Sequence, residues 1–185
     1  ELFIRRVQKN PNEVSVHVKE EGHWQPFTWG EAREAVENIA SGLLELNVKR
    51  GDCVAILSNT RREWSQIDIA SMYVGGITVG IYPTLTVEQT AHILEHSNTR
   101  LVFVEDSEQF RKVKKAASMR ELEITCVTIC DEVDGQRTLE SLMTQGARRR
   151  SQCPSELTDR MALNQSSDVV TYVYTSGTTG EPKGA

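Results

Sequence analysis

The sequence has no apolar run long enough to cross a bilayer, and its first residues, 1–6, lack the apolar stretch of a secretory signal. An excess of basic residues is also missing, because 21 Lys and Arg stand against 26 Asp and Glu. The resulting net charge of -5 argues against non-specific binding to nucleic acid. Four cysteines without a paired spacing indicate a reducing compartment rather than a disulfide framework. We therefore expect a cytoplasmic location.

Low-complexity tracts and internal repeats are absent too, which excludes linker-rich and solenoid architectures. Hydrophobic residues make up 38% of the 185 positions and charged residues 25%, as in an ordinary globular chain. The first residue is Glu1 rather than methionine, so we expect the native chain to begin upstream.

Short apolar runs alternate with longer amphipathic ones, a pattern typical of βα units around a parallel sheet. Strands are expected at 13–19, 24–29, 53–57, 77–82, 101–105, 124–129 and 169–174. Helices are expected after Thr28 and over 63–73, 86–97, 109–117 and 138–147, and the polar stretch 148–167 is expected to be a surface connection. The prediction is an α/β fold with a doubly wound, mostly parallel sheet flanked by helices.

Two capping boxes and one turn refine this prediction. Thr28 with Glu31 and Thr86 with Gln89 each have the spacing that starts a helix. The first of these helices carries Ala35, Ile39, Leu43 and Leu46 on one face. The first two strands are separated by a short polar turn at 20–23, which indicates a hairpin.

The segment 174–184 (YTSGTTGEPKG) is typical of a loop that binds polyphosphate. Its glycines permit positive φ and a close approach to a ligand, and successive free amides form an anion nest. Its hydroxyls donate hydrogen bonds to phosphate oxygens, while Lys183 adds positive charge beside the stiff Pro182. The spacing excludes the common P-loop, in which Lys-Ser/Thr directly follows the second glycine. The non-functional alternative is a flexible surface turn. A predicted strand leads directly into this segment, which favours the phosphate loop over that alternative.

The run from Tyr172 to Lys183 resembles the AMP-binding signature of the adenylate-forming superfamily, without a departure at any position. Segments 27–31 (FTWGE) and 50–55 (RGDCVA) resemble further stretches of that family, with Ala32 where leucine is usual, and 59–64 (NTRREW) is similar to its bacterial long-chain branch. The segment 75–85 (GGITVGIYPTL) is similar to the bacterial long-chain fatty acyl-CoA synthetase branch, although Gly80 stands where those enzymes often have proline. The resemblance spans nearly the whole chain.

This resemblance implies that residues 1–185 are the N-terminal part of the AMP-binding domain, ending at the phosphate loop. The remainder of that domain and a C-terminal lid domain would lie downstream, together with the Mg-binding glutamate and the catalytic lysine. The implied reaction joins a long-chain fatty acid to coenzyme A through acyl-AMP, using ATP and Mg²⁺. The implied phosphate-binding residues are Thr175, Ser176, Gly177, Thr178, Thr179, Gly180 and Lys183. The fragment alone is expected to be inactive.

Other functions remain open at this stage. An aryl-CoA ligase or a peptide-synthetase adenylation domain would carry the same loop, and so would a non-catalytic nucleotide-binding module. Acyl chain length, oligomeric state and peripheral contact with a membrane are not readable from the sequence. The run Arg148-Arg149-Arg150 is expected to be a solvated charged loop rather than a membrane contact.

A second motif, His92-Ile93-Leu94-Glu95-His96, matches the inverted zinc-peptidase pattern. No third ligand is recognisable downstream, so we expect a helix that covers the sheet, with Ile93 and Leu94 buried and the histidines at its edge. Cys53, Cys126 and Cys130 are expected to be core residues rather than zinc ligands, and no metal site is predicted in this chain.

Overall fold

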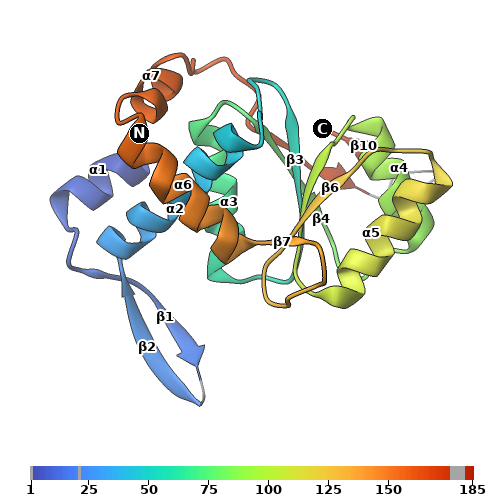
Figure 1. The fold of residues 1–185 in the computed structure, drawn as a ribbon, viewed down its shortest axis with the longest axis horizontal. Helices are drawn as coiled ribbons and strands as arrows, with labels where there is room; N and C mark the ends of the chain where they lie inside the picture. The colour runs from blue at the N-terminus through green and yellow to red at the C-terminus, as the bar shows by residue number, and fades with distance from the viewer. Residues whose placement is uncertain (1, 21, 176–181) are drawn as a thin grey trace.

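A six-stranded parallel sheet in the order β7-β6-β5-β3-β4-β8 forms the centre of the molecule (Figure 1). The computed structural model describes residues 2–20, 22–175 and 182–185. The strands of this sheet are β3 (Cys53–Leu57), β4 (Ile77–Ile81), β5 (Leu101–Val104), β6 (Thr125–Thr128), β7 (Arg137–Thr138) and β8 (Thr171–Tyr172).

Helices cover both faces of the sheet, which confirms the doubly wound fold. Right-handed crossovers require this arrangement, because the chain moves from β3 to β4 in one direction and then back past β3 to β5 and β6. One face carries α2 (Trp29–Glu45), α3 (Arg62–Tyr73) and α6 (Leu139–Gln152). The other carries α4 (Val87–His96) and α5 (Ser107–Met119), as Figure 1 shows.

Strand β3 is buried along its whole length, because both faces of the sheet are covered. Val54 and Ile56 pack with the helices α2, α3 and α6, whereas Ala55 and Leu57 pack with α4 and α5. This alternation follows from the two-residue period of a strand and divides the core into two layers.

The predicted helix starts and the hairpin are confirmed. Thr28 accepts from the Glu31 amide at 3.2 Å and the Glu31 carboxylate accepts from the Thr28 amide at 2.7 Å, and the Thr86–Gln89 box closes in the same way. Strand β1 (Val14–Glu20) pairs antiparallel with β2 (His23–Thr28). A short helix α1 (Leu2–Lys9), which the sequence analysis did not anticipate, precedes this hairpin.

The prediction of a surface connection over 148–167 was wrong. Helix α6 continues to Gln152, and a further helix α7 spans Glu156–Ala162. Arg149 pairs with Glu156 at 2.7 Å and with Glu45 of α2, while Arg150 pairs with Glu37 and Asn38 of α2. These two arginines hold α6 against α2, so they are not the solvated loop charges that the sequence analysis expected.

The final predicted strand, 169–174, is also interrupted. Only β8 pairs with β4, and the next two residues form β9 (Tyr174–Thr175), which pairs with β10 (Lys183–Gly184). Val173 lies between them and exchanges both backbone hydrogen bonds with Ala185, at 2.9 and 3.0 Å. The chain therefore changes partner at Val173, where pairing with β4 gives way to pairing with residues 183–185. No helix in the described ranges is long and apolar enough to cross a membrane.

Helices α2 and α6 cross closely because glycines stand at the contact. A Cβ atom on Gly146 would lie 1.8 Å from the Asn38 carbonyl oxygen, and one on Gly42 would lie 2.7 Å from Leu142 Cγ. Real side chains do not approach backbone atoms so closely, so the two helices would have to separate to admit a methyl group.

We predict that Gly146→Ala lowers the free energy of unfolding by about 2 kcal/mol or more, because overpacking outweighs the roughly 1 kcal/mol gain in helix propensity. Urea unfolding followed by circular dichroism measures this. Gly80→Ala is the matched control, since its added Cβ would meet Trp64 at an ordinary 3.6 Å. Equal midpoints for wild type and Gly146→Ala would contradict the packing argument.

Candidate active site

The carboxyl ends of the parallel strands meet at one edge of the sheet, where ligands bind in open α/β folds. The strand order reverses around β3, so the segments after β3, β4 and β8 lie together at this edge. A cavity of ≈ 590 Å³ opens there. Its wall includes Asn59, Arg61, Trp64, Tyr82 and Tyr172, which come from the ends of all three strands and from the start of α3.

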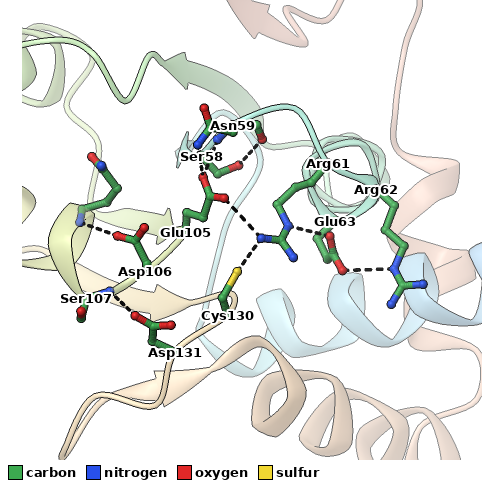
Figure 2. A network of polar contacts seen from close by, with 11 residues as sticks. Ser58, Asn59, Arg61, Arg62, Glu63, Glu105, Asp106, Ser107, Cys130 and Asp131 are labelled. Carbon is green, nitrogen blue, oxygen red and sulfur yellow. Dashed lines mark hydrogen bonds and ion pairs between the residues drawn. The ribbon is translucent and has the colours of Figure 1, made fainter. Parts of the chain in front are cut away.

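A polar network fixes one side of this cavity (Figure 2). The Glu105 carboxylate accepts from the backbone amide and side-chain amide of Asn59, at 2.7 and 2.8 Å. Glu105 follows β5 and Asn59 follows β3, so the network ties two adjacent strand ends together. Asp131, which follows β6, accepts from the Ser107 amide at 2.9 Å and extends the same edge.

Arg61 lies at the centre of the network in Figure 2. Its guanidinium donates to Glu63 at 2.7 Å, to Glu105 at 3.4 Å and to the Cys130 sulfur at 2.5 Å. Burial by itself would raise the pKa of Glu63. The hydrogen bond from Arg61, with the charges of Arg61 and Arg62, outweighs burial and holds this pKa below its ordinary value. A fixed arginine therefore borders the cavity.

The cysteines do not share one environment. Cys53 and Cys126 are buried in the core, as predicted, and burial raises the pKa of the Cys126 thiol to about 11. The same prediction was wrong for Cys130, which is exposed. Strand β6 ends at Thr128, so Cys130 lies beyond the sheet and joins the network around Arg61.

The predicted phosphate loop begins and ends at paired strands. Thr175 lies opposite Lys183 in the β9–β10 pair, which brings two of the predicted phosphate-binding residues together. The other predicted residues, Ser176, Gly177, Thr178, Thr179 and Gly180, lie outside the described residues. Since β9 follows Tyr172 and Val173 of the cavity wall, the loop starts at the same sheet edge as the cavity.

The histidines of α4 contact the strands that flank this loop. Ile93 and Leu94 are buried, which confirms the helix that covers the sheet. His96 Nδ1 lies 2.7 Å from the Tyr174 hydroxyl, and His92 Nε2 lies 2.9 Å from the Pro182 carbonyl oxygen. Within the ranges that the structure describes, no three His, Cys, Asp or Glu residues are grouped to hold a metal ion.

The sequence analysis missed Asn59, Arg61 and Glu105 as parts of this edge. A signal was present, because each follows a buried apolar strand and parallel strands bring such positions to one edge. Aromatic side chains line the cavity, and the hydroxyl-rich segment begins at its edge, so the site suits a ligand that combines an uncharged part with an anionic group.

Comparison with known proteins identifies relatives. The AMP-binding enzyme family matches residues 3–185. Long-chain-fatty-acid–CoA ligase FadD15 of Mycobacterium bovis is 37% identical over 183 residues, covering 99% of this chain and 30% of that protein. Long-chain-fatty-acid–CoA ligase ACSBG2 of Xenopus laevis is 25% identical over 185 residues, covering 100% of this chain and 25% of that protein. The chain thus spans less than a third of the length of these relatives.

Solved structures share the fold. The anthranilate CoA ligase AuaEII, determined in complex with anthranoyl-AMP, superposes with a TM-score of 0.81 at 22% identity. The match covers 99% of this chain and 33% of that protein. At this identity the likeness concerns the fold alone.

The Arg61 network makes a prediction about acid stability. Because the folded-state pKa of Glu63 lies below the usual 4.5, its stabilising contribution is complete above that value and is lost as pH falls through the lower folded-state pKa. We expect Glu63→Gln to cost about 1 kcal/mol of unfolding free energy at pH 6.5 and clearly less at pH 3.5.

Urea unfolding at both pH values measures this difference. Glu132→Gln, at an exposed position outside the network, is the matched control. A difference between wild type and Glu63→Gln that stays constant or grows as the pH falls would contradict the assigned role of Glu63.

Proposed function

The chain belongs to the AMP-binding enzyme family, and from this membership we propose that it is the N-terminal part of an enzyme that activates a long-chain fatty acid. The acid reacts with ATP to give acyl-AMP, and the acyl group is then transferred to coenzyme A. The remainder of the AMP-binding domain and a C-terminal lid domain would follow residue 185. The fragment alone would not form acyl-AMP.

In the first step, a carboxylate oxygen of the fatty acid attacks the α-phosphorus of ATP. The bond between the α-phosphorus and the bridging oxygen breaks, and pyrophosphate leaves with the electron pair. Negative charge accumulates on the leaving group, so donors placed in advance around the β- and γ-phosphates lower the barrier. We assign this role to Thr175, Ser176, Gly177, Thr178, Thr179, Gly180 and Lys183.

In the second step, the sulfur of coenzyme A attacks the acyl carbonyl carbon. The thioester bond forms, the bond from the acyl carbon to the AMP oxygen breaks, and the thiol proton leaves to solvent or to a base. No residue of this chain is assigned to that proton. The groups that act in this step would come from the downstream part of the enzyme.

The pairing of Thr175 with Lys183 is the observation that carries the proposal. It brings the two ends of the hydroxyl-rich loop together at the carboxyl edge, beside the cavity that Tyr172 helps to line. A cation opposite a hydroxyl at the base of a segment rich in glycine and hydroxyl residues is suited to a polyphosphate. Arg61, which also lines this cavity, adds no free cation, because Glu63 and Glu105 already pair with it.

Magnesium is proposed only as a companion of ATP. Among the described residues, no three His, Cys, Asp or Glu side chains are grouped to hold it. Its protein ligands would lie in the downstream part of the enzyme.

The choice of a long-chain fatty acid follows the name of the FadD15 relative at 37% identity. An aryl-CoA ligase or a peptide-synthetase adenylation domain would share the fold and the loop. A non-catalytic nucleotide-binding module would share them as well, but it would bind ATP without any reaction that depends on an acid.

The exchange of labelled pyrophosphate into ATP tests the proposal. We expect the full-length protein that contains this chain to catalyse exchange that requires a long-chain fatty acid, and not benzoate or an amino acid. Exchange that requires benzoate or an amino acid would support the other ligases, and ATP binding without any exchange would support the non-catalytic module.

Lys183→Met tests the loop itself. We predict a loss of about 100-fold in the exchange rate, because a charged donor to the leaving pyrophosphate is removed. Lys9→Met is the matched control, since Lys9 is exposed and lies in α1, on the opposite side of the molecule from β10 (Figure 1). A rate for Lys183→Met equal to that of Lys9→Met would remove Lys183 from the proposed site.

A further inference from the structure

Two histidines on α4 contact the chain on both sides of the phosphate loop, at Tyr174 in β9 and at Pro182 before β10. His92 and His96 are one helical turn apart, so they share one face of the helix. Their rings lie 5.6 Å apart with an angle of 30° between the planes. The proposed reaction uses neither side chain, and the described residues offer no third ligand for a metal at this pair.

His96 contacts the strand that leads into the loop. Its Nδ1 atom lies 2.7 Å from the Tyr174 hydroxyl, and the two rings meet edge to face at 5.7 Å and 88°. Tyr174 is buried, and its ring packs so close to Gly184 that a Cβ there would lie 3.0 Å from Tyr174 Cζ. The Tyr174 side chain is thus fixed between α4 and β10.

His92 contacts the residue that precedes β10. Its Nε2 atom donates to the carbonyl oxygen of Pro182 at 2.9 Å, which requires the proton to be on Nε2. Pro182 directly precedes Lys183, the cation of the predicted phosphate site. One helix therefore bonds to the residue before Thr175 and to the residue before Lys183.

The loop depends on the contacts with α4 because the β9–β10 pair at its base is short. The strands β9 and β10 have two residues each, and a pair of this length is only marginally stable by itself. Helix α4 is held in place in the fold, since Ile93 and Leu94 are buried and the Thr86–Gln89 capping box closes its first turn. The histidines connect this base to both ends of the loop.

We propose that His92 and His96 are positioning residues that hold the two ends of the phosphate loop at a fixed separation, so that Thr175 and Lys183 reach the phosphates of ATP together. The inference rests on the proposed function, because it assigns the loop to ATP. Small displacements of such groups have large effects, and about 1 Å costs up to roughly 100-fold in rate. In this proposal the histidines act through Pro182 and Tyr174, so their loss would weaken ATP binding without altering the affinity for the acid.

The test uses the full-length protein that contains this chain, with ATP binding measured by calorimetry and pyrophosphate exchange measured kinetically. We expect His92→Leu and His96→Leu each to raise the Kd and KM for ATP about tenfold, with the KM for the fatty acid unchanged. His92→Gln and His96→Asn restore the affinity, because their amide nitrogens replace Nε2 and Nδ1. Tyr174→Phe should raise the Kd for ATP as much as His96→Leu does. The double variant that combines Tyr174→Phe with His96→Leu should have a Kd no higher than that of either single variant.

His17→Leu, on the exposed hairpin strand β1, is the matched histidine control and should leave both constants unchanged. If the wild type binds ATP but shows no acid-dependent exchange, the proposed function is contradicted. The ratio of the Kd for ATP between each histidine variant and wild type would still test the role of the histidines. An unchanged Kd in both leucine variants would overturn the inference, as would equal weakening in the conservative variants. If the leucine variants do not fold, Tyr174→Phe replaces them as the test, because it removes the hydroxyl that His96 contacts. An unchanged Kd for ATP in that variant would then overturn the inference. Wild type that binds no ATP would overturn both proposals.

Discussion

The parallel pairing of β3 with both β4 and β5 is the constraint on which the rest of the structure depends. It places β3 in the middle of the sheet, where the helices on both faces bury every one of its residues. It also makes the strand order reverse at β3, which leaves the segments after β3, β4 and β5 together at one edge. The cavity and the Arg61 network lie where this reversal requires the chain to open.

The site is built on this frame by contacts between segments that are distant in sequence. Arg50 donates to Asp168 at 2.8 Å and to Asn164 at 3.0 Å, which holds the approach to β8 near the start of β3. Strand β8 then ends beside the cavity, and the β9–β10 pair brings Thr175 opposite Lys183. The histidines of α4 reach this pair from the helix layer that packs on Leu57 and Val79. The core layer beneath α4 and α5 therefore connects the sheet to both ends of the phosphate loop.

Much of the fold could be predicted, because the information was local. The strands at 53–57 and 77–82 were bounded by polar residues and glycines, and the Thr28 and Thr86 boxes close at the predicted residues. The features that were not predicted depend on contacts between residues distant in sequence. Arg149 and Arg150 pair with Glu45 and Glu37, 104 and 113 residues away, so residues 148–152 looked like a solvated loop. The break at Val173 depends on Ala185, and the role of the α4 histidines depends on Tyr174 and Pro182. No local pattern encodes such pairings.

Transfer of oxygen from the acid to AMP tests the central claim most directly. The full-length protein would be given a fatty acid labelled with ¹⁸O in both carboxyl oxygens, together with ATP and coenzyme A, and the products would be weighed by mass spectrometry. Attack of the carboxylate on the α-phosphorus predicts AMP that carries one labelled oxygen. Unlabelled AMP, or label found in orthophosphate with ADP as the other product, would contradict an adenylate intermediate and with it the assignment of the loop.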